Sequence, residues 1–364
     1  MLRKVLLLCV LASAVLMNGH ALKMAGSTAA AATPISIYGA WLCGNDFCTW
    51  AGVRDMTEFD AKNRWLVDRG DGRPSVNLVV LSFVHPLRLL NKTTDAQTLN
   101  GIPRGMTPEV VNYFKSRNVR VMLSIGGITY TDAWNQALAT NPTQFGLNAA
   151  EAAQRLGVGI EIDYEENTNP NLAGLQAFIN AYRSVLPYDP SGANHAARLT
   201  IDLAAGDRWL IAITRKATVE WLNTTTPVLD YANAMVPNKQ PSTSGAIANW
   251  QEHVDGKPRF DPPIPPLAPA KFTGSLYIVT GTRPAPECTK FSSSLISSTA
   301  NFVQNVAPNG AGTTNGMLGY MFWAAECPST RRVCTTPPNS CEGGVGVGAT
   351  TFNIPIPMLP LRQS

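Results

Sequence analysis

The sequence has few histidines and no cluster of like charges. Only four of its 364 residues are histidine, and none is spaced with cysteine as zinc ligands are. It has no block of basic residues and no run of acidic ones, and the formal net charge is only +4. These absences argue against a zinc site, and nothing in the charge pattern indicates a nucleic-acid partner. We therefore expect no metal, no cofactor and no bound nucleic acid.

Long hydrophobic runs are absent beyond the N-terminus, so no later segment is expected to cross a bilayer. Residues 1–32 begin with the basic segment Met1–Lys4, continue with the largely apolar stretch 5–17 and end in small residues. This pattern predicts a secretory signal peptide, cleaved after Ala21 or within 29–32, and an uncleaved anchor is the alternative. The mature protein is therefore expected to be secreted, extracellular and free of the membrane.

Seven cysteines are present, and Cys9 would leave with the signal peptide. The six that remain are Cys43, Cys48, Cys288, Cys327, Cys334 and Cys341. An even number of cysteines in a secreted chain predicts disulfides, although six allow 15 pairings. Cys43 and Cys48 are the expected local pair.

Strand-like and helical segments alternate along most of the chain. Eight strand-like runs recur, at 35–37, 77–84, 119–125, 158–164, 198–205, 229–236, 273–280 and 317–323. The clearer helical patterns between them are 106–117, 144–156, 171–185, 215–224 and 292–305. This alternation predicts an α/β fold, a (β/α)₈ TIM barrel over residues 33–326. An open doubly wound sheet is the alternative, but no glycine-rich phosphate loop follows a strand.

Two stretches depart from the alternation. Residues 256–269 hold six prolines and are expected to form an extended connection. Residues 327–364 are rich in Cys, Pro and Gly and show no amphipathic helix, so the eighth helix is expected to be weak or missing. We predict a disulfide-tied C-terminal tail. A carbohydrate-binding module is disfavoured, because Phe352 is the tail's one aromatic residue.

The most informative stretch is 156–166, which reads L-G-V-G-I-E-I-D-Y-E-E. Its alternation has period two, so Glu161, Asp163 and Glu165 share one face of a strand and apolar side chains occupy the other. Helical patterns on both flanks predict that both faces are covered. Three buried carboxylates repel one another and must take up protons or find donors, which is typical of acid–base sites. An exposed edge strand is the alternative.

Two segments carry a resemblance to a known family. V-G-I-E-I-D-Y-E resembles the D-G-x-D-x-D-x-E strand of glycoside hydrolase family 18, the chitinases and endo-β-N-acetylglucosaminidases. Ser124–Gly127 (S-I-G-G) resembles the family's S-x-G-G signature, about 35 residues earlier. Asp163 and Glu165 match the family pattern, whereas Val158 replaces its first Asp and Glu161 its second.

The resemblance implies a role for each carboxylate. In this family the nucleophile is the N-acetyl oxygen of the sugar itself. Glu165 would then be the general acid and afterwards the general base. Asp163 would orient and stabilise the acetamido group, and Glu161 would support Asp163.

The resemblance also implies substrate-binding residues. Trp323 resembles the terminal Trp that forms the floor under the sugar, and Tyr38 and Phe83 resemble aromatic positions that line the site. Gly126 and Gly127 belong to the S-x-G-G signature. A core role is the alternative for Trp323, Tyr38 and Phe83. Trp41, Tyr130, Trp134 and Trp209 follow predicted strand ends, where a polysaccharide groove would want rings, but each alone is more often packing than platform.

The sixth strand contains the most important departure. Met235–Asn238 (M-V-P-N) resembles the family's M-x-Y-D. Met235 matches and Asn238 replaces the Asp, so both are candidate substrate-binding residues. Pro237 replaces the Tyr that hydrogen-bonds the N-acetyl carbonyl, and proline offers no donor.

These features predict a secreted, monomeric, chitinase-like hydrolase that cleaves β-1,4 bonds in N-acetylglucosamine polymers with retention and with weak turnover. Its partners would be chitin or N-acetylglucosamine oligosaccharides. An endo-β-N-acetylglucosaminidase acting on N-glycans is an alternative. A chitin-binding lectin or decoy is another, favoured by Pro237 and Val158 and opposed by the retained Asp163 and Glu165.

Overall fold

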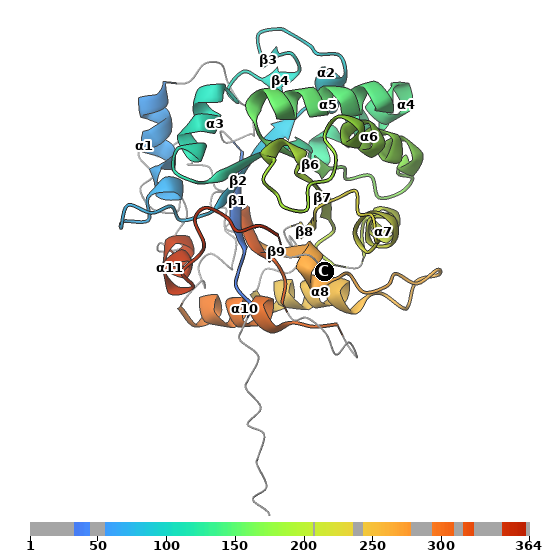
Figure 1. The fold of residues 1–364 in the computed structure, drawn as a ribbon. Helices are drawn as coiled ribbons and strands as arrows, with labels where there is room; N and C mark the ends of the chain where they lie inside the picture. The colour runs from blue at the N-terminus through green and yellow to red at the C-terminus, as the bar shows by residue number, and fades with distance from the viewer. Residues whose placement is uncertain are drawn as a thin grey trace, which may run out of the picture. The chain divides into compact units, whose positions relative to one another are not determined.

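Eight parallel strands close into a barrel in the computed structural model, as the alternation of strands and helices predicts (Figure 1). The structure describes residues 33–43, 55–206, 208–235, 243–277, 293–308, 316–323 and 344–361. Around the barrel the strand order is β1-β10-β9-β8-β7-β6-β5-β2. The strands are β1 Ile37–Leu42, β2 Leu78–Val84, β5 Arg120–Gly126, β6 Gly159–Asp163, β7 Leu199–Leu203, β8 Ala232–Ala234, β9 Phe272–Tyr277 and β10 Gly319–Trp323.

All eight strands overlap the predicted runs, which confirms the (β/α)₈ barrel. The largest difference is β1, which continues to Leu42, beyond the predicted end at residue 37. The Gly39–Ala40 pair has low strand propensity, but β1 pairs with β2 and β10 along both edges. Pairing on both sides outweighs the local preference. A short antiparallel hairpin, β3 (Thr98–Leu99) and β4 (Ile102–Pro103), lies outside the barrel sheet.

The five predicted helices are present. They are α3 Pro108–Lys115, α5 Pro142–Leu156, α6 Leu172–Val185, α10 Ser293–Asn305, and the pair formed by α7 Ile211–Lys216 and the π-helical segment Ala217–Leu222. α5 shows why its bounds are well defined. Asn141 accepts a hydrogen bond from the backbone N–H of Gln144, Pro142 occupies the first helical position, and Gly157 ends the helix with φ +64°. These are the usual start and stop signals of a helix.

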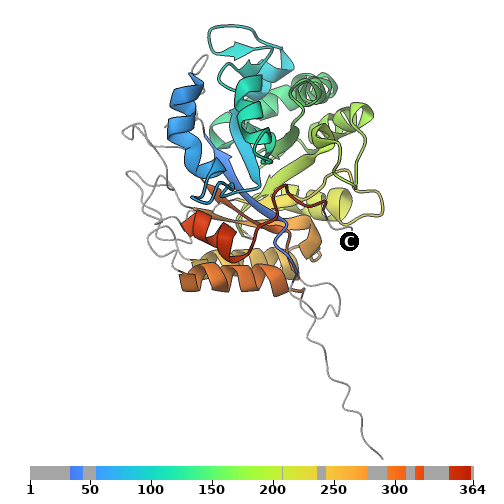
Figure 2. The same cartoon turned by 60° about the vertical axis from the view of Figure 1, so that its left-hand side comes forward.

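Several further helices lie outside the predicted patterns. They are α1 Met56–Val67, α2 Pro86–Leu90, α4 Thr131–Thr140, α8 Thr243–Asp255 and α11 Gly344–Thr351. The most informative is α11, because the sequence predicts that the eighth helix is weak or missing, and the tail contains a short helix of eight residues. Its sequence, GVGVGATT, has poor helix propensity. Val345 and Ala349 are nevertheless fully buried, and α11 lies beside α10, so tertiary packing stabilises it (Figure 2).

Residues 256–268 connect α8 to β9 as irregular chain, and an antiparallel bridge between Lys257 and Ile264 folds the segment back on itself, so it is not extended throughout as predicted. Among the cysteines, Cys43 is described and is disulfide-bonded. The other five, together with residues 1–32, lie outside the described residues, so the disulfide framework and the signal peptide stay predictions. None of the described helices is long and apolar enough to cross a membrane.

The apolar side chains form two clusters, one between barrel and helices and a smaller one inside the barrel. The inner cluster contains Ile37, Trp41, Leu78, Val80, Met122, Tyr231, Leu318 and Met321. The tail closes the N-terminal end of the strands. Met358 and Leu361 pack against the inner cluster, and Asn77 Nδ2 donates to the Pro355 carbonyl at 3.0 Å. The C-terminal ends of the strands form the opposite end, where active sites of this fold lie.

Candidate active site

Glu161 and Asp163 lie inside the barrel, as the alternation of β6 predicts. Val158, Ile160 and Ile162 belong to the outer cluster, which faces the helices. Glu161 is fully buried and Asp163 is 4% exposed. Carboxylates on the interior face of one strand therefore form a column that runs toward its C-terminal end.

Glu161 is held by residues from opposite sides of the barrel. Trp41 Nε1 donates to Oε1 at 2.8 Å, and Asn233 Nδ2 donates to Oε2 at 2.7 Å. Asn233 Nδ2 also donates to Asp202 Oδ1 at 3.0 Å, while Thr273 donates to Asn233 Oδ1 at 2.6 Å. Because the amide oxygen of Asn233 accepts from Thr273, its NH₂ group is fixed toward the two carboxylates. The network orients Glu161 from β1, β7, β8 and β9.

Burial changes the protonation of these carboxyl groups. It raises the pKa of Glu161 to about 7, against the opposing effect of the hydrogen bond from Trp41. Burial, and then the charge of Glu161, raises the pKa of Asp202 well above its usual range. The pKa of Asp163 is also raised well above its usual range, by burial and then by Glu165 and Glu161. At neutral pH these three carboxyl groups together therefore hold protons that carboxyl groups in water would have lost.

Glu165 lies two residues beyond Asp163, past the last residue of β6, and is partly exposed. Burial raises the pKa of Glu165 to about 7. Its carboxylate accepts a hydrogen bond from the backbone N–H of Ile128, which acts in the opposite direction and lowers the pKa. Asp163 Oδ1 is buried and has no hydrogen-bond partner among the described residues. Glu165 is thus a carboxyl group with a pKa near 7 at the open end of the barrel, next to a buried Asp163 oxygen that can accept a hydrogen bond from a ligand. This arrangement suits acid–base chemistry.

The glycines of the S-I-G-G segment allow close packing around this pair. Gly126 has φ +124°, and a Cβ there would lie 1.9 Å from the Asp163 carbonyl oxygen. Gly127 has φ +89°, and a Cβ there would lie 3.1 Å from the Phe83 ring. The Gly127 N–H donates to the Asp163 carbonyl at 3.0 Å. The signature therefore positions the end of β6 and leaves room for Phe83.

We expect Gly126→Ala to lower the free energy of unfolding by on the order of 3 kcal/mol or more, because both the backbone conformation and the space exclude a Cβ. Gly70→Ala is the matched control. Gly70 has φ +104°, and a Cβ there would meet nothing within 4 Å, so it isolates the backbone cost, about 1–2 kcal/mol. Denaturant unfolding measures both. Equal losses in the two variants would contradict the close approach at Asp163.

Phe83 and Trp323 come together at the mouth. Both are partly exposed, and their ring centroids lie 5.6 Å apart with planes tilted by 31°. Phe83 lies where the register between β2 and β5 shifts, and Trp323 is the last residue of β10. Partly exposed rings at the C-terminal ends of strands suit stacking on the CH faces of a sugar.

Tyr38 does not line this site, and that prediction is wrong. Its ring packs edge-to-face on Tyr320 at 5.2 Å and on Phe322 at 5.1 Å in the outer cluster. Its hydroxyl donates to the Val345 carbonyl at 2.8 Å, so it anchors α11 to the barrel. Trp134 is likewise core, since it is fully buried and donates from Nε1 to the Ile125 carbonyl.

The candidates of the sixth strand are only partly placed. Met235 follows β8, is partly buried and packs against the outer cluster, while its N–H donates to the Leu203 carbonyl at 2.8 Å. Asn238 and Pro237 lie outside the described residues, so their roles stay predictions.

Sequence reasoning missed Asp202, Asn233 and Thr273, and gave no specific role to Trp41. The available signal was a polar residue inside an otherwise apolar strand, as in L-T-I-D-L at 199–203. Within the described part of the chain, no group of three or more His, Cys, Asp or Glu is arranged to hold a metal ion.

Comparison with known proteins supports the fold. No protein-family model matches the chain, and no curated protein sequence matches it. The structure resembles that of YKL-39 solved in the presence of chitooligosaccharides, with 11% identity, 86% of this chain and 99% of that chain covered, and a TM-score of 0.52. It also resembles a chitinase from Rhizomucor miehei, with 12% identity, the same coverages and a TM-score of 0.50. The resembling structures are family 18 chitinases and chitinase-like proteins, and at these identities the likeness shows the fold.

Proposed function

We propose that the protein is a chitinase-like glycoside hydrolase that cleaves β-1,4 bonds between N-acetylglucosamine units with retention. The observation that carries the proposal is the pair formed by Asp163 and Glu165 at the C-terminal end of β6. Glu165 is partly exposed with a pKa of about 7, and Asp163 beside it keeps a buried oxygen without a hydrogen-bond partner among the described residues.

In the proposed reaction, protonated Glu165 donates its proton to the glycosidic oxygen while the acetamido oxygen of the substrate attacks the anomeric carbon. The C1–oxygen bond breaks, and a cyclic oxazolinium ion forms. Asp163 Oδ1, which has no hydrogen-bond partner among the described residues, accepts a hydrogen bond from the acetamido N–H and in this way stabilises the ion. Glu165 then takes a proton from water, which opens the ring and restores the configuration. Trp41 and Asn233 hold Glu161 in place below Asp163.

N-acetylglucosamine oligomers are the proposed substrate for two reasons. Substrate assistance requires an acetamido group, and the rings of Phe83 and Trp323 offer an apolar surface for a sugar face. One resembling structure was solved with chitooligosaccharides, which fits a carbohydrate ligand. We further propose that the protein acts outside the cell as a monomer with oxidised cysteines, as its N-terminal segment and even cysteine count suggest.

A lectin-like role is the second candidate, and Pro237 favours it. Incubation with chitin oligomers, with products analysed by mass, separates the two when insoluble chitin binding is measured in parallel. Shortened products support the hydrolase. Binding without products supports the lectin. If the protein neither binds chitin nor forms products, both proposals are overturned.

The raised pKa of Glu165 predicts the pH dependence of hydrolysis. Since the acid form is the reactive one, kcat/KM should fall as pH rises through about 7, by roughly tenfold per unit above it. Measuring kcat/KM between about pH 5 and 9 checks this. A profile that is flat across neutral pH would show that Glu165 is not the acid.

A further inference from the structure

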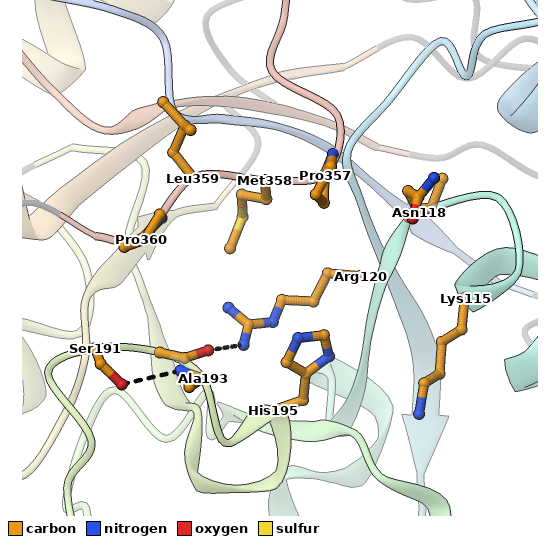
Figure 3. A pocket seen from close by; sticks show the side chains of 12 residues that line it. Lys115, Asn118, Arg120, Ser191, Ala193, His195, Pro357, Met358, Leu359 and Pro360 are labelled. Atoms are coloured by element: carbon orange, nitrogen blue, oxygen red, sulfur yellow. Dashed lines mark hydrogen bonds between the residues drawn. The ribbon is translucent and has the colours of Figure 1, made fainter.

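A cavity of about 290 Å³ opens at the end of the barrel opposite Glu165. Arg120 is the first residue of β5, so its side chain lies at the N-terminal ends of the strands. The cavity lies between the loop 191–195 and the tail segment 357–360 (Figure 3). The Arg120 guanidinium occupies the middle of the opening, with the His195 ring beside it. Nothing in the proposed reaction uses this end of the molecule.

Arg120 is a buried cation without a carboxylate partner among the described residues. It is 7% exposed, and its one hydrogen bond there runs from a terminal nitrogen to the Gly192 carbonyl at 2.6 Å. Its Nε is buried and makes no hydrogen bond within the same part of the chain. A buried charge is costly unless it is paired, and a neutral carbonyl oxygen compensates it only in part. The side chain is therefore poised for an anion.

The neighbouring acidic groups are already engaged. Asp230 pairs with Arg183 at 3.1 Å and with Arg198 at 3.3 Å, and it accepts a further bond from the Leu199 N–H. Asp189 accepts hydrogen bonds within its own loop, from residues 191 and 194. The Asp230 carboxylate thus pairs with the guanidiniums of Arg183 and Arg198, and Arg120 adds a third positive charge that it does not pair with.

The groups around Arg120 make the cavity both cationic and partly apolar. Lys115 lines it and makes a long hydrogen bond, at 3.3 Å, to the Gly157 carbonyl, the one hydrogen bond of its ammonium group among the described residues. Burial, and then the charge of Arg198, lowers the pKa of Arg120 to about 10, so the guanidinium remains charged at neutral pH. The tail supplies an apolar wall, of which Met358 and Leu359 are the largest side chains.

We propose that this cavity is a binding site for an oxyanion that carries an apolar substituent, such as a phosphate monoester. Arg120 Nε and Lys115 Nζ donate to the oxyanion, and Met358 contacts the substituent. A free small molecule fits better than a membrane headgroup, because the guanidinium is buried between the loop and the tail.

Calorimetric titration of the folded protein with inorganic phosphate and with phenyl phosphate, at constant ionic strength set by chloride, tests the proposal. We expect saturable binding of both, with phenyl phosphate several-fold tighter. Arg120→Gln should weaken binding by roughly tenfold or more, and Lys115→Gln by a few fold. Met358→Ala should remove the advantage of phenyl phosphate.

Arg155→Gln is the matched control, since Arg155 is exposed at the end of α5, does not line the cavity, and carries the same charge. It should change affinity by less than about twofold, because salt screens exposed charges.

Lys115 is partly exposed, so its variant keeps the test valid if Arg120→Gln fails to fold. No binding to the wild type, or equal losses in the Lys115 and Arg155 variants, would overturn the site. Equal affinity for inorganic phosphate and phenyl phosphate would show that the apolar wall does not contact the substituent, and would overturn that part of the proposal. Turnover of chitin oligomers plays no part in the test.

Discussion

Replacing Glu165 by Gln should reduce hydrolysis of chitin oligomers by about 10²–10⁴-fold, the usual contribution of a general acid. The amide keeps the shape of the carboxyl group and can donate a hydrogen bond, but it cannot transfer a proton to the leaving oxygen. Binding of the oligomer should change little, because Phe83 and Trp323 are expected to contact the sugar in ground and transition states alike. Steady-state kinetics together with equilibrium binding measure the two effects separately.

Glu166→Gln is the control for this variant, since it makes the same chemical change one residue further along. The Glu166 carboxylate accepts hydrogen bonds from Asn135 and from the backbone of Thr168 and Asn169, and these lower its pKa. Its role is to hold the loop after β6, so the substitution should cost stability and leave most of the turnover. Unchanged turnover in Glu165→Gln would move the acid elsewhere and end the proposed mechanism.

The sequence was sufficient for the barrel and for the inward carboxylates because both depend on local periodicity. In β6 one face is acidic and the other apolar, so alternation alone decides that Glu161 and Asp163 share the interior. Gly126 and Gly127 could also be anticipated, since a glycine pair at a strand end indicates a close approach of backbones.

Tyr38 is assigned to the site by resemblance, and alternation cannot correct that assignment because both faces of β1 are apolar. Ile37, Gly39 and Trp41 share one face and Tyr38 and Ala40 the other, so alternation cannot say which face is inside. The structure resolves the choice through register. Trp41 reaches Glu161 across the barrel, whereas Tyr38 bonds α11.

The network around Glu161 could not be predicted for a different reason. Asp202, Asn233 and Thr273 are single polar residues in three separate strands, and only the pairing of β7 with β8 and of β8 with β9 brings them together. Arg120 is a similar case, since its lack of a carboxylate partner among the described residues depends on how Asp230 and Asp189 are used elsewhere.

Asp163→Ala should reduce turnover by at least about 10²–10³-fold, the cost of losing one group that stabilises transition-state charge. Asp163 is expected to stabilise the forming oxazolinium ion almost alone. Where the resembled family has a Tyr that donates to the acetamido carbonyl, this chain has Pro237, which has no side-chain donor. For the same reason we expect weak wild-type turnover with ordinary affinity for the oligomer.

A double-mutant cycle with Pro237→Tyr tests this division of labour. The tyrosine should raise wild-type turnover and reduce the penalty of Asp163→Ala, because two groups would then share the developing charge.

Asp202→Asn is the control. Asp202 lies in the same buried network through Asn233, one strand away from Asp163, so its loss should affect stability more than turnover. Wild-type turnover as fast as that of family members with the Tyr would contradict the argument. So would a bound oligomer whose acetamido carbonyl already accepts a hydrogen bond from another hydroxyl or amide, since the donor lost at Pro237 would then be replaced and Asp163 would not act alone.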